Sequence, residues 1–418
     1  MTSIAARELW LALLVGLLVL MGCVVQASIG SIDGIPHHRI FLQWIAVSAM
    51  AAVVVRLIPY GFVLRHAPLI YLGGLLLLIL VQLVGEVRFN ARRWIVIGGV
   101  SVQPSELMKF AFVIFWARVL RHERAAKGLR ALVLPGLALA LPVALIFRQP
   151  DLGTALLFVP TALAMLLAAG MPRGQMVKLC LVGVLMSALG YGLLEPYQKE
   201  RILSTFQRER LTAAEKAREG YQLEQSIRSI AMGGVFGQGF AEGVQNRMKM
   251  LPFRHNDFIY AVVAEEFGFV GASFLIGVVL LLTVTILRVG FQVRDESGRL
   301  LCVGLGVLYA SQSFVHIAVN LGIAPTTGMP LPFVSAGGTS LLTNVCALAL
   351  VSSVARRPRR VVGGGSLREQ LMRLEALLGR RKPRDEATAR VAGVGADGRF
   401  RGPGVRTSDR VAPRPDHF

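Results

Sequence analysis

Four segments of this sequence place charged or polar residues beside long apolar runs, where a charge is costly and usually serves a function. The first is NARRWIVIGGVSVQPSELMKF, residues 90–110. Its Glu106 and Lys109 are three residues apart, so they lie on one face of a helix. They could form an ion pair that only orients the helix, or they could contact a substrate. Arg93 lies just before this helix, where a guanidinium could bind a phosphate through two hydrogen bonds.

The second segment is RQPDLGTA, residues 148–155, a tight turn that leads into an apolar run. Asp151 stands at the predicted start of a helix. A carboxylate at that position accepts hydrogen bonds from free backbone N–H groups and meets the positive end of the helix dipole. A helix cap is therefore the favoured interpretation of Asp151, and substrate binding is the alternative.

The third segment, residues 220–271, ends an outer loop and enters an apolar helix. Asp257 could be only a helix cap, but a cap does not need Arg254 and His255 beside it. Glu265 follows inside the span, eight residues later, which is about 12 Å along a helix. Paired carboxylates of inverting sugar hydrolases are about 6.5–9.5 Å apart. We therefore do not expect these two carboxylates to act as a direct acid–base pair.

The fourth segment is LGIAPTTGMPLPFVSAGGTSLL, residues 321–342, which includes Ser335 and carries no charge. Its many Pro, Gly, Ser and Thr residues make a poor continuous helix. Irregular backbone at membrane depth is tolerated where it faces protein or a water-filled cavity. We therefore favour a re-entrant, cavity-lining loop over an ordinary outer connection.

Composition identifies the medium in which these segments fold. The 418 residues are 54% hydrophobic and 17% charged, whereas soluble proteins have about 25% charged residues. The apolar residues form blocks long enough to cross a bilayer, which needs about 20 residues. The formal charge of +20 lies in loops and in the C-terminal tail, a distribution typical of membrane orientation and not of nucleic-acid binding. The sequence therefore predicts an all-α polytopic membrane protein.

We predict ten spans, with a large extracytoplasmic loop at 195–257 between the seventh and the eighth. Lys and Arg in the short loops of one side outnumber those of the other by 12 to 5. The richer side is cytoplasmic by the positive-inside rule, so both termini are cytoplasmic. We expect the long eighth span to be tilted or broken near Gly268 and Gly271. The predicted spans are 9–29, 40–58, 67–84, 105–120, 129–147, 151–170, 174–194, 258–288, 300–321 and 333–354.

The chain is predicted to have two domains. Residues 1–355 form the membrane domain, and residues 356–418 form a basic, mostly disordered cytoplasmic tail that is rich in Arg, Gly and Pro. Within the tail, residues 366–379 have leucines at helical spacing. This pattern indicates either a short amphipathic helix at the membrane surface or a transient helix in a solvated tail.

The four segments, in this order and on one predicted side, resemble signatures of the SEDS family of peptidoglycan glycosyltransferases, the FtsW and RodA type. The resemblance covers about residues 85–345 and includes QPSEL, QPDLGTA, FGQG, HNDFIYAV and PLPFVSAGG. GYQL, FGQG and PTTG look like the FtsW subgroup, whereas FRHNDF and AEEFGFVG look like RodA; we lean towards FtsW. The family usually has Thr where Asn256 stands and Tyr where Ala336 stands.

The resemblance implies an enzyme of the bacterial inner membrane that polymerises lipid II, a disaccharide-pentapeptide on undecaprenyl pyrophosphate. It would release undecaprenyl pyrophosphate during cell division or elongation. The resemblance also implies a class B penicillin-binding protein as the crosslinking partner, together with other divisome or elongasome membrane proteins. Asp257 matches the essential aspartate of the family. The predicted substrate-binding residues are Arg93, Glu106, Lys109, Asp151, Arg254, His255 and Ser335.

The residues suit that reaction chemically. Conversion of an α-linked lipid pyrophosphate into a β-1,4 glycan needs one inversion, and so one general base, for which Asp257 is the candidate. The leaving pyrophosphate needs positive charge, from Arg93, Lys109 and Arg254 or from a divalent cation such as Mg²⁺ or Mn²⁺. No carboxylate cluster in the sequence identifies a metal site, so the cofactor question stays open.

Two other functions remain as alternatives. A lipid II flippase or another polyprenyl-lipid transporter would also have ten spans and intramembrane charges, but it would be expected to show an inverted repeat, which the motifs do not. A scaffold that recruits division proteins through its tail would leave the clustered outer charges unexplained.

Overall fold

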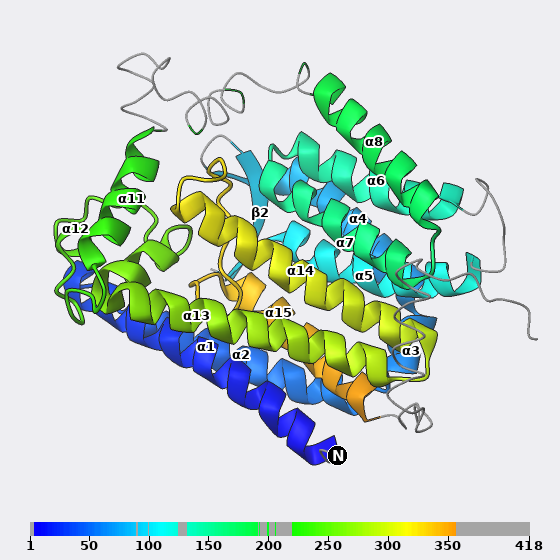
Figure 1. Ribbon diagram of the computed structural model, residues 1–418, viewed down its shortest axis with the longest axis horizontal. Helices are drawn as coiled ribbons and strands as arrows, with labels where there is room; N and C mark the ends of the chain where they lie inside the picture. The colour runs from blue at the N-terminus through cyan, green and yellow to red at the C-terminus, as the bar shows by residue number, and fades with distance from the viewer. Residues whose placement is uncertain are drawn as a thin grey trace, which may run out of the picture. The chain divides into compact units, whose positions relative to one another are not determined.

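The apolar runs form helices, because a helix satisfies every backbone hydrogen-bonding group within its own segment, as the membrane interior requires. The computed structural model describes residues 4–88, 91–98, 100–123, 132–190, 192, 199, 205 and 220–356, all within one unit, Met1–Arg360 (Figure 1). The longer helices are α1 (Ile4–Asp33), α2 (His37–Leu57), α4 (Ala67–Val84), α5 (Pro104–Glu123), α6 (Val133–Arg148), α7 (Leu152–Ala168), α8 (Arg173–Gly190), α13 (Ile259–Gln292), α14 (Glu296–Asn320) and α15 (Gly338–Ala355). Shorter helices are α3 (Tyr60–Arg65), α11 (Tyr221–Gly233) and α12 (Val244–Arg247).

Each of the ten predicted spans coincides with one of the longer helices. In the described part of the chain, six helices are long and apolar enough to cross a membrane by length and composition alone: α1, α2, α4, α13, α14 and α15. Helices α6 and α7 are apolar but shorter. The prediction of a helical, multi-pass membrane protein is confirmed. The predicted tail lies outside the described residues from position 357 onward, and so does most of the predicted outer loop before residue 220.

A small antiparallel sheet between α4 and α5 was not predicted. Its strands are β1 (Glu86–Arg88), β2 (Ala91–Ile97) and β3 (Val100–Val102), in the order β1-β2-β3. Strand β2 packs against α4 and α5, and β3 packs against α15. The hydroxyl of Thr339, in the first turn of α15, donates to the carbonyl of Ser101 at 2.9 Å. The sheet thus joins the start of α5 to the start of α15.

Helix α14 is the element against which several others pack. It lies beside α13, which has α1 on its other side, and it also contacts α7 and α5 (Figure 1). Buried polar side chains form hydrogen bonds between α14 and its neighbours. Such bonds help helices to associate in a membrane, where lipid provides no hydrophobic driving force between them. Tyr309 donates to the carbonyl of Asn344 in α15 at 2.8 Å. Asn320 accepts from the N–H of Ala261 at 3.1 Å, which fixes the end of α14 to the start of α13.

Helix α13 is broken where the sequence predicted, at Gly268, whose φ of +65° and ψ of −164° are open only to glycine. The break leaves carbonyl and N–H groups without helical partners, and residues 234–239 supply them. Gln238 and Gly239 donate to the carbonyls of Glu265 and Glu266 at 2.9 and 3.0 Å. Phe269 and Val270 donate to the carbonyls of residues 234 and 235 at 2.9 and 3.1 Å. Residues 234–239 of the outer loop are therefore bonded to the kink through backbone hydrogen bonds.

Candidate active site

The uncharged segment 321–337 between α14 and α15 contains Ser335 and contacts the segment that carries His255 and Asp257. It is not helical, yet Met329, Leu331, Phe333 and Ser335 are all at most 3% exposed. Gly153, at the start of α7, packs so closely on it that an added Cβ would lie 2.6 Å from Cβ of Thr327. The start of the segment is more open, since Leu321 and Ile323 are 40% and 62% exposed. Irregular backbone that is buried in protein from 329 to 335 is compatible with the predicted re-entrant loop, which stays a prediction.

Asp257 lies against this segment and just before α13. The helix begins at Ile259 with Phe258 as its N-cap residue, so the cap interpretation of Asp257 does not describe the structure. The backbone of Asp257 is held by its N–H bond to the Phe253 carbonyl at 2.9 Å and by Asn320 Nδ2, which donates to its carbonyl at 3.2 Å. Its half-buried carboxylate lies beside Gly328, where an added Cβ would be 3.7 Å from Oδ2.

Ser335 ties the 253–257 segment to this loop. Its hydroxyl donates to the carbonyl of Asn256 at 2.7 Å and accepts from the N–H of Leu331 at 2.8 Å. Next to it, the N–H of Ala336 donates to the carbonyl of His255 at 3.2 Å. The buried hydroxyl of Ser335 therefore holds the backbone beside Asp257, and this positioning role is the one that its contacts support.

Glu106 and Lys109 form the predicted ion pair. Lys109 Nζ lies 2.8 Å from Glu106 Oε1, and the two side chains are 1% and 2% exposed. Lys109 also donates to Gln312 Oε1 at 2.8 Å, and Gln312 Nε2 donates to the carbonyl of Pro330 at 2.8 Å. The buried pair on α5 is thus connected through α14 to the same loop that faces Asp257. Gln312 was not predicted, because its partners are distant in the sequence.

Asp151 is both a cap and a link between helices. One carboxylate oxygen accepts from the N–H of Thr154 at 3.2 Å, which is the predicted N-cap of α7. The other accepts from Gln103 Nε2 at 3.3 Å and from the hydroxyl of Ser105 at 3.4 Å. The residue therefore holds the start of α5 to the start of α7.

Arg93, on β2, contacts the turn that precedes Asp151. Its Nε donates to the carbonyl of Gln149 at 2.9 Å, and its Nη2 donates to the carbonyl of Pro150. Among the described residues, Arg93 forms no ion pair with a carboxylate. Its positive charge is consequently held in place by neutral carbonyls in the part of the chain that the structure describes.

Arg254 and His255 belong to a second cluster, on the α1 side of the site, that sequence reasoning missed. Asp33, the last residue of α1, pairs with Arg254 at 2.5 Å, with Lys249 at 3.4 Å and with His37 at 3.5 Å. The ring of His37 stacks on that of His255, with centroids 5.1 Å apart. Burial, and to a lesser extent the charge of His37, lowers the pKa of His255, which favours its neutral form. The only local signal was an acid and a histidine four residues apart at the end of the first apolar run.

Glu265 and Glu266 bind the outer loop and not Asp257, which agrees with the predicted separation. Glu265 accepts from the N–H of Gln245 at 2.6 Å, and Glu266 accepts from Asn246 Nδ2 at 2.7 Å and from the hydroxyl of Ser28. Both carboxyl groups are buried. They fix α12 between α13 and α1. Within the described part of the chain, no group of three or more His, Cys, Asp or Glu residues could hold a metal ion.

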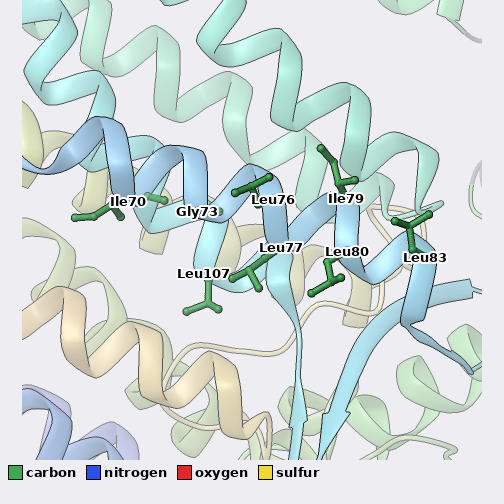
Figure 2. Close-up of a pocket in the computed structure, with 10 residues that line it drawn as sticks. Ile70, Gly73, Leu76, Leu77, Ile79, Leu80, Leu83 and Leu107 are labelled. Atoms are coloured by element: carbon green, nitrogen blue, oxygen red, sulfur yellow. The ribbon is translucent and has the colours of Figure 1, made fainter.

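An apolar cavity of about 710 Å³ lies along α4 and α5, the helix that carries Glu106 and Lys109. Figure 2 shows the leucine and isoleucine side chains of α4 that line it, with Leu107 of α5 beside Leu77. Leu107 follows Glu106 in the chain. The cavity therefore reaches the turn of α5 that contains the buried Glu106–Lys109 pair. Its lining is Ile70, Gly73, Gly74, Leu76, Leu77, Ile79, Leu80, Leu83, Leu107 and Ala111.

Comparison with known proteins places this arrangement in a family. The family described as cell cycle protein FtsW/RodA/SpoVE matches residues 5–360. The peptidoglycan glycosyltransferase MrdB of Escherichia coli is 32% identical over 345 residues, which cover 82% of this chain and 92% of that protein. A probable peptidoglycan glycosyltransferase FtsW of Coxiella burnetii is 30% identical, with 83% and 96% covered. Relatives of both names match at similar identity, so the leaning towards FtsW stays a prediction.

Solved structures agree with the sequence matches. A structure that describes the coordination of polymerisation and crosslinking by a peptidoglycan synthase complex contains a chain similar to this one, with a TM-score of 0.72 and 30% identity over 83% of this chain and 96% of that chain. RodA of Thermus thermophilus has a TM-score of 0.62 and 27% identity over 83% and 95%. The four segments thus identified the right family: this chain belongs to the FtsW/RodA/SpoVE family of cell cycle proteins.

Proposed function

We propose that this peptidoglycan glycosyltransferase polymerises lipid II, with Asp257 as the general base. The observation that carries the proposal is the half-buried Asp257 carboxylate, which lies beside Gly328 of the uncharged loop, while Lys109 is connected through Gln312 to Pro330 of the same loop. Names of the relatives support the reaction class, since MrdB and FtsW are both called peptidoglycan glycosyltransferases. The roles of individual residues follow from their contacts.

In the proposed step, the 4-hydroxyl of the acceptor sugar attacks C1 of the donor sugar. The bond between C1 and the pyrophosphate oxygen breaks, and its electron pair leaves with the pyrophosphate. The proton of the attacking hydroxyl passes to the carboxylate of Asp257. A single displacement inverts an α-linked donor into a β-linked product, and a base in this position contributes about 10²–10⁴-fold in rate.

Positive charge for the leaving pyrophosphate comes from residues on the same side of the site. Lys109 and Arg254 already face Glu106 and Asp33, so part of their charge is balanced within the protein. Arg93, in contrast, is held by the carbonyls of residues 149 and 150 and has no carboxylate partner among the described residues. We infer that Arg93 provides the main contact with the pyrophosphate, because a charge without a local carboxylate gains most from a bound anion. Glu106, Asp151, His255 and Ser335 keep the surrounding backbone and cations in place.

The polyprenyl chain of the substrate needs an apolar surface next to this site. The cavity between α4 and α5 is lined almost entirely by aliphatic side chains, and it reaches Leu107 beside the Glu106–Lys109 pair (Figure 2). A lipid bound along it would have its tail in the membrane and its pyrophosphate near the start of α5. This arrangement supports a lipid-linked donor over a soluble sugar nucleotide.

We also propose a membrane orientation and a partner protein. The site faces the extracytoplasmic side of the bacterial inner membrane, with both termini cytoplasmic, as the distribution of Lys and Arg indicates. A class B penicillin-binding protein crosslinks the product, and the similar chain within a complex that both polymerises and crosslinks supports this partnership. Other divisome or elongasome membrane proteins would join the same assembly.

Purified full-length protein in detergent, given lipid II alone and with the partner transpeptidase, tests the reaction. We expect glycan strands and released undecaprenyl pyrophosphate. The transporter alternative predicts a different result, in which liposomes containing the protein move lipid II between leaflets and no polymer forms with or without the partner. That outcome would reject the glycosyltransferase assignment for this chain.

A further inference from the structure

A second cavity, which unlike the first is polar, lies at the opposite end of the helices from Asp257. It has a volume of about 200 Å³ and is formed by α3, by the last turns of α5 and by the turn that joins α13 to α14. Helix α5 has 20 residues and is therefore about 30 Å long, so it carries Glu106 at one end and this cavity at the other. The lining residues are Tyr60, Gly61, Leu64, Arg65, Arg118, Arg121, Asp295 and Ser297.

The cavity carries three arginines and one carboxylate, an excess of positive charge. Arg121 lies 3.3 Å from Asp295 and donates to the hydroxyl of Ser297 at 3.4 Å. Arg118 donates to the carbonyls of Leu64 and Arg65 at 2.9 and 2.7 Å, and it forms no ion pair in the described part of the chain. The guanidinium of Arg65 also has no ion-pair partner among the described residues.

The hydrogen bonds around these arginines are more extensive than the positive-inside rule requires. The positive-inside effect needs only basic residues in a loop, and exposed arginines such as Arg294 fulfil it without forming a cavity. Here, Tyr60 donates to Asp295 at 2.9 Å and the N–H of Gly298 donates to the same oxygen at 2.9 Å. These bonds fix the carboxylate that holds Arg121, while Arg118 holds the end of α3 and thereby the backbone of Arg65.

We propose that this cavity binds the phosphate group of an anionic membrane lipid. Guanidinium groups bind phosphate oxygens in pairs, and basic pockets between membrane helices commonly hold anionic headgroups. The cavity is smaller than the roughly 300–1,000 Å³ of sites that enclose a drug-sized molecule, so it suits a headgroup whose acyl chains remain in the bilayer. This inference does not depend on the proposed reaction, since no residue of the cavity belongs to the candidate active site.

The test compares lipid binding by wild-type protein, Arg65→Gln and Arg294→Gln in a neutral detergent. Arg294 is a matched control, because it is exposed at the α13–α14 turn and does not line the cavity. Native mass spectrometry and thermal stability are recorded with added dioleoyl phosphatidylglycerol, dioleoyl phosphatidylcholine or inorganic phosphate. We expect saturable stabilisation by phosphatidylglycerol, weakened about tenfold in Arg65→Gln, the loss typical of one charge-assisted hydrogen bond. Arg294→Gln should bind as wild type, and Arg65→Lys should fall between.

The outcomes separate the sources of the phosphate. Stabilisation by phosphatidylglycerol that inorganic phosphate does not reproduce assigns the site to a lipid, whereas equal stabilisation by inorganic phosphate alone overturns that assignment. Equal weakening in Arg65→Gln and Arg294→Gln would also overturn the proposal, because it would reduce the effect to the general charge of this end of the protein. Because Arg65 is exposed and not ion-paired in the described structure, its replacement should leave folding intact.

Discussion

At the residue scale, the decisive feature is the buried ion pair that is connected to the uncharged loop 321–337. Lys109 and Glu106 are almost fully buried, and Lys109 reaches the loop through Gln312. A buried ion pair is weak evidence for stability by itself, since desolvation costs about as much as the attraction returns. We therefore propose that the pair serves the reaction, through the position of the loop or through the charge of Lys109.

Replacing one partner of this pair should destabilise the protein by about 3–5 kcal/mol, because the other charge is then buried alone. The double variant Glu106→Gln with Lys109→Met leaves no lone charge, so we expect its thermal stability to recover substantially. We expect lipid II polymerisation to stay low, because the cation near the pyrophosphate is gone. Unfolding curves and polymerisation assays on both single variants and the double variant separate the two effects. A fully active double variant would leave the pair with a structural role only.

At the element scale, the outer loop and α13 are joined through the break at Gly268. A Cβ at this position would lie 2.3 Å from the N–H nitrogen of Gly237 and 2.5 Å from the carbonyl oxygen of Val235. The break lies between Asp257 and the C-terminal part of α13, and its hydrogen bonds hold residues 234–239 to the helix. The kink is therefore part of what positions the outer loop.

We expect Gly268→Ala to lower the free energy of unfolding by about 1–3 kcal/mol, the cost of a strained backbone conformation, with further loss from the clash. Gly277→Ala is the matched control, because Gly277 lies in the same helix with no atom within 4 Å of an added Cβ. This control should be neutral or slightly stabilising, since alanine favours a helix. Denaturation of both variants in the same detergent makes the comparison. Equal stability of the two would mean that the break is not required.

The elements also show what the sequence could predict. Each span was found because a run of apolar residues long enough to cross a bilayer is a strong local signal, and the kink was found because Gly268 interrupts such a run. The sheet at residues 86–102 was missed because its strands are short and its charges suggested only an interface. Asp33 and Gln312 were missed for a different reason. Their partners, Arg254 and Lys109, are more than 200 positions away, and one sequence does not show such contacts.

At the scale of the whole molecule, the candidate active site and the basic cavity lie at opposite ends of the helices, which fits one orientation in the membrane. We predict that the 220–257 segment is extracytoplasmic. Cysteine labelling tests this in a variant without the four native cysteines. Glu242→Cys, on the outer loop, should react with a membrane-impermeant reagent in intact cells. Arg294→Cys, at the α13–α14 turn, should react only after permeabilisation. The reverse pattern would invert the orientation and the assignment of the donor side together.

The most direct test of the central claim is glycan synthesis by Asp257→Asn. This replacement keeps the shape of the side chain but cannot accept the proton, so we predict normal thermal stability and a loss of lipid II polymerisation of about 10²–10⁴-fold. Glu224→Gln is the control, since Glu224 is an exposed acid on α11 that pairs with Arg228 at the surface, and it should retain full activity. Substantial polymerisation by well-folded Asp257→Asn would contradict the account, because no other carboxylate of the described site lies against the loop in the same way.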